Sequence, residues 1–433
     1  MRIENMELLA VKQQLHIEGL KQELSFYKNR KNSGNSHMPP SVDLVKGNQS
    51  LREKSDKKAG GQQGHEGSTL KFSATPDQII TYSPDYCQLC GDDLEQIAAL
   101  PLTRRQVIDI PIPAAICTEH RTFAKTCSCG HVNKGKFPVN VNAHVQYGSH
   151  IEALTAYLNV RQYMPFGRIQ EFYSKIMGLE ISHGGIVGLL QRFTGRALPV
   201  YQEIKNRIEK AACLETDETG AKINGKTHWF WTWQNEALTF VVQSPSRGYK
   251  TIQETFPDGL PDVVLVHDRW AAHFRCEAYH HQVCLAHLFR DLNYITQVHG
   301  SNWAQSIALN NQPDYDGLAA SPARNELERS LMLFLLQHQL PDKDKLAIRL
   351  QKKLRKISHH ILCFLHYNNV PPDNNGSERA IRTIKVKQKV SGGFRSLEGA
   401  DGFAVIRSVI DTTIKSGNDV FHALNLIANF TPE

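Results

Sequence analysis

Apolar residues recur at helical spacing in two parts of the chain. In residues 148–210 they fall every three or four positions, and breaks at 165–167 and 178–185 divide the stretch into three predicted helices. A helix-turn-helix DNA reader has this outline, and so does a small helical bundle. In residues 1–31 the pattern is amphipathic over about three heptads, which fits a coiled-coil dimer helix and a single surface helix equally.

A strand-like pattern begins after residue 210. Short apolar or alternating runs predict three strands, at 213–220, 228–233 and 238–242. Asn224-Gly225, between the first two runs, is typical of a hairpin turn. After a helical stretch at 248–256, the apolar run 262–268 predicts a buried parallel strand. The pattern therefore predicts an antiparallel meander joined to a parallel strand.

The composition allows several domains and narrows the class of protein. A chain of 433 residues with 41% hydrophobic residues can bury more than one core. No apolar run reaches the roughly 18 residues of a membrane span, and the first residues lack a signal-peptide core, so we expect a cytoplasmic protein without membrane association. The formal charge of +7 suits a polyanionic partner. Residues 32–75, rich in Ser, Asn, Gly, Pro and Lys, predict a basic flexible linker.

Two cysteine pairs, each followed by glycine, come after the linker. The chain has nine cysteines, an odd number, and no secretion signal, which disfavours a disulfide framework. Cys-Gly turns direct backbone amides at thiolate sulfur, so the pairs predict a structural Zn²⁺ site in a small module at 76–147. The predicted ligands are Cys87, Cys90, Cys127 and Cys129. The second pair is more closely spaced than usual, and His131 is an alternative ligand; the other interpretation is buried free thiols.

Two of the predicted strands carry carboxylates where they end. Asp217 lies on the first strand and Asp268 closes the parallel one, so the two side chains converge if the strands are neighbours. Carboxylates held by rigid elements, with open positions between them, are what hard divalent cations need. Glu218 and Asp262 are rival ligands. Adjacent strand residues point to opposite faces, and the alternation of the preceding residues favours Asp217 over Glu218.

A third carboxylate leads a basic helix. Ser377 is predicted to cap a helix that begins around Glu378, and Arg382, Lys385 and Lys389 lie within about 40° of this acid on the helix face. Six Lys and Arg against one acid between residues 378 and 395 give the stretch a charge of +5, which suits a DNA backbone. A solvated basic helix would explain the charges but not the single acid. The predicted DNA-contacting residues are Arg379, Arg382, Lys385, Lys389 and Arg395.

Several short motifs occur in an order and spacing that together are specific. They are NSGNSHMPPS, GGQQGHEG, the two cysteine pairs, TDETG, HDRW, CLAH, NNGSERAIR and GGFRSLEGADGFAVIRSVIDTTIKSGNDVFHAL. Through these motifs the chain resembles the DDE transposases of the insertion-sequence sixty-six family over nearly its full length. The three acids are 51 and 110 residues apart, which fits a core with a helical insertion before the last acid.

The resemblance implies a catalytic Asp217, Asp268 and Glu378 on a ribonuclease-H-like fold. These residues would bind two Mg²⁺, with Mn²⁺ as an alternative, and the enzyme would break and join phosphodiesters at transposon ends in double-stranded DNA. A homo-oligomer on paired ends is also implied, and accessory proteins often accompany members of the family. Two other functions are compatible with the residues. One is a DNA-binding regulator or inactive transposase relic, and the other is a metal-dependent nuclease that does not join ends.

Many DDE families carry a Cys-x-x-His motif between the second and third acids. Cys284-Leu-Ala-His287 falls there. Either it positions something near the insertion, or His287 is a hydrogen-bonded core histidine, which is the more common case. On the second strand, His267 is predicted to face away from the site if Asp268 faces in.

The predicted fold class is a multidomain α+β protein. Its parts are an N-terminal amphipathic helix at 1–31, the linker at 32–75, a zinc-ribbon-like module at 76–147, a helix-turn-helix-like segment at 148–210, a ribonuclease-H-like catalytic domain at 211–415 with a helical insertion at about 285–365, and a C-terminal helix at 416–433.

Overall fold

A computed structural model describes most of the chain. The described residues are 70–111, 113–310, 323–337, 339–342, 344–367 and 369–430, with helical pieces at 13–14, 16–17 and 20–21. The chain divides into two compact units, Val45–Pro113 and a larger one made of Met1–Leu44 and Ala114–Glu433. Most of the predicted N-terminal helix and nearly all of the predicted linker lie outside the described residues.

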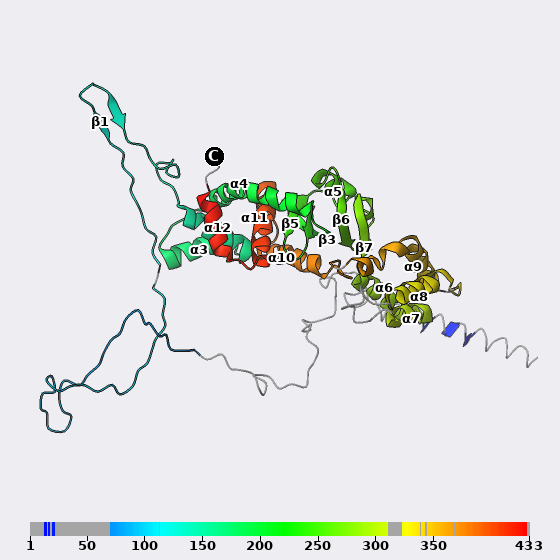
Figure 1. Ribbon diagram of the computed structural model, residues 1–433, viewed down its shortest axis with the longest axis horizontal. Helices are drawn as coiled ribbons and strands as arrows, with labels where there is room; N and C mark the ends of the chain where they lie inside the picture. The colour runs from blue at the N-terminus through cyan, green and yellow to red at the C-terminus, as the bar shows by residue number, and fades with distance from the viewer. Residues whose placement is uncertain are drawn as a thin grey trace, which may run out of the picture. The chain divides into compact units, whose positions relative to one another are not determined.

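A five-stranded mixed sheet forms the centre of the larger unit (Figure 1). Its strands are β3 (Cys213–Ile223), β4 (Lys226–Gln234), β5 (Thr239–Ser244), β6 (Leu260–His267) and β7 (Ala278–Val283). In the spatial order β5-β4-β3-β6-β7, the first three strands form an antiparallel meander, and β6 and β7 run parallel to β3. The predicted meander and parallel strand are confirmed. Strand β7 was not predicted, because its sequence AYHHQV has no apolar run.

The turn between β3 and β4 has the geometry that its sequence predicts. Asn224 and Gly225 have φ angles of 46° and 75°, and Ile223 pairs with Lys226 across the turn. Positive φ at both central residues is typical of a type I′ hairpin turn, for which Asn-Gly is the favoured sequence. The turn fixes the register of the hairpin, in which Asp217 pairs with Thr232.

Helices from both ends of the larger unit share one core with the sheet. They are α2 (Ser149–Ala156), α4 (His183–Ile208), α11 (Leu397–Lys415) and α12 (Val420–Asn429), whereas α3 (Phe166–Met177) packs with α2 and α4 in a separate apolar cluster. The breaks between α2, α3 and α4 fall at the predicted positions, and a π-helical turn, Tyr157–Arg161, extends α2. Tyr201 of α4 stacks on Phe240 of β5 and donates from Oη to the Val241 carbonyl, 2.8 Å away. Helices α2 and α4 of the segment 148–210 therefore pack into the same core as the sheet.

Helix α10 (Asn375–Ser391) lies along β3 and is tied to it at both ends. At its first turn, the Gly376 amide donates to Glu215 Oε2 at 2.7 Å. Beyond its last turn, the Phe394 amide donates to the Lys222 carbonyl at 2.8 Å. Between them Ile384 is fully buried in the core that contains the sheet. The position of α10 on the sheet is thus set by contacts at Gly376 and Phe394, 18 residues apart.

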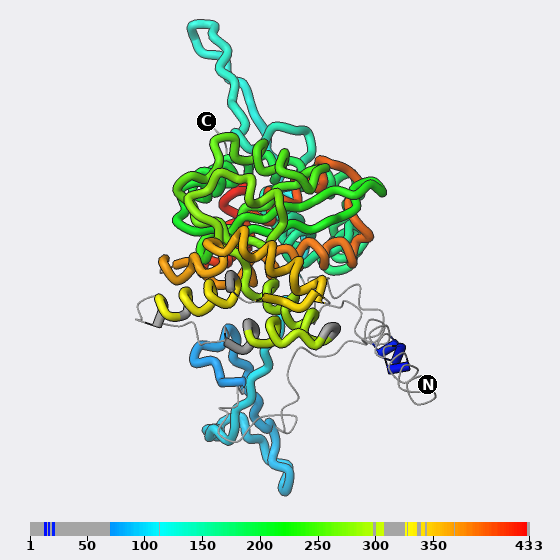
Figure 2. The backbone as a smooth tube through the Cα atoms, turned by 90° about the vertical axis from the view of Figure 1, so that its right-hand side faces the viewer, coloured from blue at the N-terminus to red at the C-terminus, as the bar shows by residue number. Residues whose placement is uncertain are grey.

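A helical insertion separates the second and third acids (Figure 2). It consists of α6 (Leu285–His299), α7 (Asn302–Asn310), α8 (Ala323–Gln337) and α9 (Lys345–Lys356), followed by the 3₁₀ turns Ser358–His360 and Cys363–His366. Its apolar side chains form a second core with Cys213, Val264 and Val266 of the sheet. In the part of the chain that the structure describes, no helix combines the length and the apolarity needed to span a membrane.

Candidate active site at the edge of the sheet

Asp217 and Glu218 lie on opposite faces of β3. Glu215, two residues before Asp217 and therefore on the same face, accepts the hydrogen bond from Gly376 that anchors α10. Asp217 thus faces the helix that carries Glu378. Glu218 points to the other face, where its carboxylate accepts from Arg247 Nε at 2.7 Å and lies 3.1 Å from His273 Nε2. The geometry agrees with the choice of Asp217 over Glu218.

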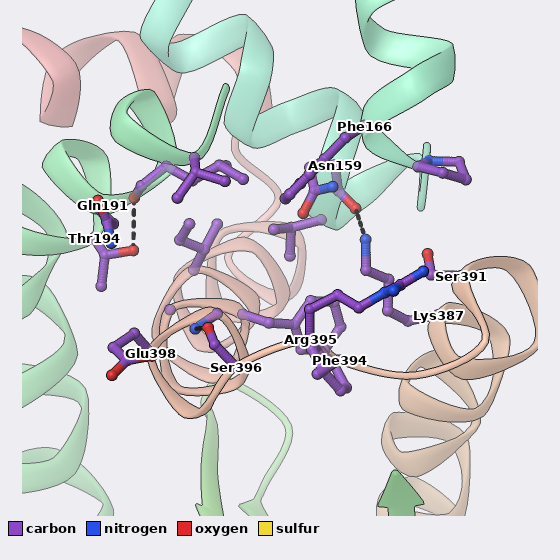
Figure 3. Close-up of a pocket in the computed structure, with 18 of the residues that line it drawn as sticks. Asn159, Phe166, Gln191, Thr194, Lys387, Ser391, Phe394, Arg395, Ser396 and Glu398 are labelled. Atoms are coloured by element: carbon purple, nitrogen blue, oxygen red, sulfur yellow. Dashed lines mark hydrogen bonds between the residues drawn. The ribbon is translucent and has the colours of Figure 1, made fainter. Parts of the chain in front are cut away.

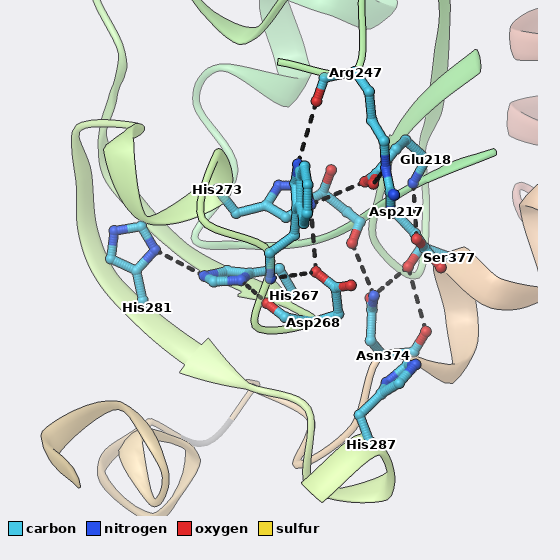
Figure 4. Close-up of polar contacts among 12 residues, drawn as sticks. Asp217, Glu218, Arg247, His267, Asp268, His273, His281, His287, Asn374 and Ser377 are labelled. Atoms are coloured by element: carbon cyan, nitrogen blue, oxygen red, sulfur yellow. Dashed lines mark hydrogen bonds and ion pairs between the residues drawn. The ribbon is translucent and has the colours of Figure 1, made fainter. Parts of the chain in front are cut away.

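Asp268 directly follows the last residue of β6. Its Oδ1 accepts from the Trp270 amide at 2.8 Å and lies 3.7 Å from His273 Nε2 (Figure 4). His267, the residue before it, is fully buried on the other face and contacts His281, with 3.0 Å between the two ring nitrogens. Asp268 and His267 therefore point in different directions, as predicted for adjacent residues.

Glu378 lies in the first turn of α10. Its Oε1 is 3.5 Å from the Arg290 guanidinium and 3.6 Å from His287 Nε2. The predicted helix start is wrong by one turn: the helix begins at Asn375, and Ser377 donates its hydroxyl hydrogen bonds to Asn374 instead of capping the helix. Tertiary contacts set this earlier start.

Asn374 anchors the start of α10 to two other elements. Its amide donates to the Cys284 sulfur at 3.2 Å, and its Nδ2 donates to the Thr216 carbonyl at 2.8 Å. Cys284 immediately precedes α6, and Thr216 immediately precedes Asp217. Because Asn374 is fully buried, these bonds fix the backbone that leads to Glu378 relative to the strand that carries Asp217.

Asp268 and Glu378 both lie within electrostatic reach of Asp217. The pKa of Asp217 is raised well above its ordinary value, first by burial and then by the negative charges of Glu218, Asp268 and Glu378. One amide donor, that of Glu218 at 2.8 Å, opposes this shift. Clustered carboxylates that raise the pKa of one of their number are typical of sites that receive a cation or share a proton.

The chemistry of these donors fits a hard divalent cation. Carboxylate oxygens on two strands and a helix are the ligands that Mg²⁺ prefers. Among the described residues, no three His, Cys, Asp or Glu side chains are already placed to hold an ion between them. The side chains of Asp217, Asp268 and Glu378 would therefore need to turn towards a bound ion.

A network beside the site escaped the sequence analysis. Glu218 is buried between Arg247 and His273. Burial alone would raise the pKa of Glu218, but the hydrogen bonds and charges of His273 and Arg247 outweigh it and lower that pKa. The Arg247 guanidinium also lies over two indole rings, 4.8 Å from Trp229 and 4.3 Å from Trp270. His273 thus connects Glu218 to Asp268, and the network supports the loop that holds the second acid.

The Cys-x-x-His motif belongs to the site. The Cys284 sulfur accepts from Asn374, and His287 Nε2 lies near Glu378. Burial is the main cause of a lowered pKa for His287. His287 Nε2 faces Glu378, and its buried Nδ1 has no hydrogen-bond partner among the described residues, which favours the interpretation that the motif positions a group near the insertion.

The predicted DNA-contacting side chains share the exposed side of α10 and the turn after it. Arg379, Arg382, Lys385, Lys389 and Arg395 are all exposed. Lys385 also donates to the carbonyl of Gly220, on the strand that carries Asp217, at 2.7 Å. Lys387, which contributes to the charge of the same stretch, is buried on the other side of the helix. The basic stripe therefore begins at the predicted acid and continues along the helix.

The two Cys-Gly turns belong to different units, and in each the glycine amide donates to the carbonyl of the first cysteine, across four residues in the first turn and three in the second. Gly91 donates to the Cys87 carbonyl and Gly130 to the Cys127 carbonyl, both at 2.9 Å, and the two glycines have φ of 78° and 84°. The second turn joins β1 (Ala124–Thr126) to β2 (Val132–Lys134). Hydrogen bonds from the Cys90 and Leu89 amides lower the pKa of Cys87 to about 7, and bonds from Cys129 lower that of Cys127. Both turns therefore favour thiolates.

Comparison with known proteins adds the family. The fold and the acids at its edge define an α+β domain with a carboxylate-rich site. The profile of the Transposase IS66 family matches residues 144–402, more than half of the chain, and the match includes all three acids. The chain belongs to this family of transposases, which confirms the resemblance found in the motifs. A comparison with curated proteins gives no match.

Proposed function

We propose that the protein cuts and joins DNA at transposon ends, with Asp217, Asp268 and Glu378 as its catalytic acids. The proposal rests on the places of Asp217 on β3, Asp268 after β6 and Glu378 on α10, and on the pKa of Asp217, which burial raises most and the charges of Asp268 and Glu378 raise further. The order β5-β4-β3-β6-β7, with three antiparallel and then two parallel strands, supports a ribonuclease-H-like core. Membership of a transposase family supports DNA as the substrate.

The three acids would hold two Mg²⁺, or Mn²⁺ in their place. Divalent ions at such a site activate the attacking oxygen and stabilise the leaving oxygen of a phosphodiester. The chain's own residues prepare the site: Asn374 fixes the start of α10 against β3, and His287 and Arg290 restrain the Glu378 carboxylate. The basic stripe along α10 would hold the DNA backbone beside the acids by charge.

The proposal is tested with DNA that flanks the protein's own reading frame. Purified protein with Mg²⁺ is expected to nick a duplex carrying the element's end and to join the freed 3′ end to a second duplex, and a chelator should abolish both products. Sequencing gels resolve the nicked and joined strands. Nicking without joining would identify a nuclease, and binding without either product would identify a regulator. We expect an oligomer on paired ends, which light scattering of the complex would reveal.

We also propose that the Cys87–Cys90 turn and the Cys127–Cys129 turn each supply thiolate ligands for structural Zn²⁺. Two observations support this proposal. In each turn the glycine amide donates to the carbonyl of the first cysteine, and the pKa values of Cys87 and Cys127 are lowered. Thiolates are the form that binds zinc, and backbone amides near their sulfur stabilise that form.

Thiol labelling tests the zinc proposal. In metal-free protein at pH 7, iodoacetamide is expected to modify Cys87 and Cys127 quickly, and Cys213 and Cys284 hardly at all, because burial raises the pKa of each of these two to about 12. One equivalent of Zn²⁺ should protect Cys87 and Cys127 from modification by iodoacetamide. Exposed Cys117 lies outside both turns and serves as the control whose labelling Zn²⁺ leaves unchanged. Equal labelling of Cys87 with and without Zn²⁺ would contradict the proposal.

A further inference from the structure

A cavity of about 980 Å³ lies beyond the last turns of α10, away from the acids. Its walls come from the π-helical turn after α2, from α3 and α4, and from the segment that joins α10 to α11 (Figure 3). The volume is at the upper end of the range for sites that bind small molecules. Part of the lining is apolar, with Phe166, Val187, Leu190, Phe394 and Ile406.

One end of the cavity is cationic, and its buried polar groups have few hydrogen-bond partners among the described residues. Lys387 is 6% exposed, and its ammonium group donates to the Asn159 carbonyl at 3.2 Å. No acidic side chain of the described residues forms an ion pair with it. Ser391, one turn further along α10, has a buried hydroxyl with no hydrogen-bond partner among the described residues. Figure 3 shows the Arg395 side chain on the same side of the cavity. A buried cation and an unpartnered hydroxyl side by side favour an anionic ligand group.

The other end of the cavity is acidic. Glu398 lies at the first turn of α11, away from Lys387 in Figure 3, and Asp401 follows one turn later. Gln191 and Thr194 of α4 line the cavity as well. Carboxylates and amide groups at this end can accept hydrogen bonds from an amino group. The cavity is therefore polarised, with a site for an anion at one end, apolar walls in the middle and acceptors at the other end.

From this polarity we infer that the cavity binds one unstacked nucleotide of the DNA. Its phosphate would lie near Lys387, Ser391 and Arg395, its base between the apolar walls, and an exocyclic amino group of the base near Glu398 and Asp401. The inference rests on the proposed function, because it takes the DNA at the acids as given.

The length of α10 sets the distance between the two sites. Lys387 and Ser391 follow Glu378 by nine and thirteen residues. At about 1.5 Å per residue they lie roughly 14 and 20 Å along the helix axis. A DNA strand rises about 3.4 Å per nucleotide, so a strand that follows the exposed basic stripe passes the level of Lys387 and Ser391 about four to six nucleotides from the acids. One nucleotide would enter the cavity around the end of α10, past Arg395. The length of α10 would thus fix the number of nucleotides between the cleaved phosphate and the extruded base.

The experiment compares a short paired DNA duplex with the same duplex carrying one bulged adenine. A bulged base is already unpaired, so a protein that binds an extruded nucleotide gains affinity for it. By fluorescence anisotropy, the full-length protein is expected to bind the bulged duplex about tenfold more tightly than the paired one. Equal binding of both duplexes would overturn the inference and leave the proposed function standing. Loss of all DNA binding would count against the proposed function as well.

Two variants of the cavity lining and one control variant test whether the preference for the bulged duplex arises in the cavity. Val187→Trp, at a partly exposed position of the lining, fills the cavity and should abolish the preference for the bulge without weakening binding to the paired duplex by more than about twofold. Ile176→Trp, on an exposed part of α3 outside the lining, is the matched control and should keep the preference. Lys387→Met removes the buried cation, and this variant should also lose the preference for the bulged duplex. If Lys387→Met fails to fold, Val187→Trp still decides, because a preserved preference in that variant overturns the inference.

Free nucleotide could supply the same chemistry, and a separate arm distinguishes it. Titration of the protein with deoxyadenosine 5′-monophosphate alone is expected to show binding much weaker than that of the bulged duplex, because the DNA adds contacts along the basic stripe. Tighter binding of the free nucleotide than of the bulged duplex would assign the cavity to a soluble nucleotide and overturn its assignment to DNA.

Discussion

Asp217→Asn is expected to abolish Mg²⁺-dependent cleavage and joining, with a loss of at least about 10³-fold in rate. Ligands of catalytic ions contribute several kcal/mol to the barrier, and each 1.4 kcal/mol corresponds to about tenfold in rate. The amide keeps the size and hydrogen-bonding capacity of the side chain, so a folded protein is expected. Cleavage of the element's end at the native rate would show that Asp217 is not a catalytic acid.

The same substitution is expected to stabilise the metal-free protein at neutral pH. The folded state raises the pKa of Asp217 above its ordinary 3.8, so the folded chain holds a proton that the unfolded chain releases. The free energy of unfolding therefore falls as the pH rises above 3.8, because the unfolded chain loses the proton more readily. An Asn side chain carries no such proton, so the variant does not lose this stability. Thermal unfolding at pH 7 should give a higher Tm for the variant. Excess Mg²⁺ should raise the Tm of the native protein by mass action and leave that of the variant nearly unchanged.

Glu218→Gln is the matched control, because it changes the adjacent carboxylate on the other face. Glu218 accepts bonds from Arg247 and His273, and the variant is expected to lose about 1–3 kcal/mol of stability, since hydrogen bonds to charged groups contribute about this much. Its stabilisation by Mg²⁺ should remain. The opposite pattern, with Mg²⁺ stabilising Asp217→Asn but not Glu218→Gln, would exchange the roles of the two acids.

Local patterns predict the sheet better than they predict the site. The alternation on β3, the Asn-Gly turn and the apolar run of β6 each act over a few residues, and each element formed where its pattern predicts. The choice of Asp217 over Glu218 depends only on which face of β3 is covered by α10. Because side chains alternate between the two faces of a strand, the face of any one residue of β3 fixes the faces of both acids.

Contacts between distant residues explain what the sequence could not show. Arg247 and His273 are 29 and 55 residues from Glu218, and nothing in their own surroundings marks them as partners of a buried acid. Asn374, which sets the start of α10, is 158 residues from the Thr216 carbonyl to which it donates. A capping pattern centred on Ser377 is a local signal, and these tertiary bonds override it.

Gly376→Ala is expected to destabilise the protein by about 2–3 kcal/mol, the cost of forcing a methyl group into a packed site. A Cβ built on Gly376 would overlap with the Gln234 amide and the Glu215 carboxylate. Glu215 accepts from the Gly376 amide, and Gln234 accepts from Lys415 at 2.8 Å, so neither side chain can move without losing a hydrogen bond. Urea unfolding measures the change.

Helix propensity alone predicts the opposite sign for this substitution. Alanine is favoured over glycine in a helix by about 0.5–1 kcal/mol, and Gly195→Ala in α4, where a Cβ meets no atom within 4 Å, should gain that amount. The contrast isolates the close approach of α10 to β3 and β4. Because Glu378 lies two residues after Gly376, a shift of the first turn by about 1 Å should also reduce cleavage about 100-fold. If Gly376→Ala were as stable and as active as Gly195→Ala, the contact between α10 and Glu215 would not be what positions the third acid.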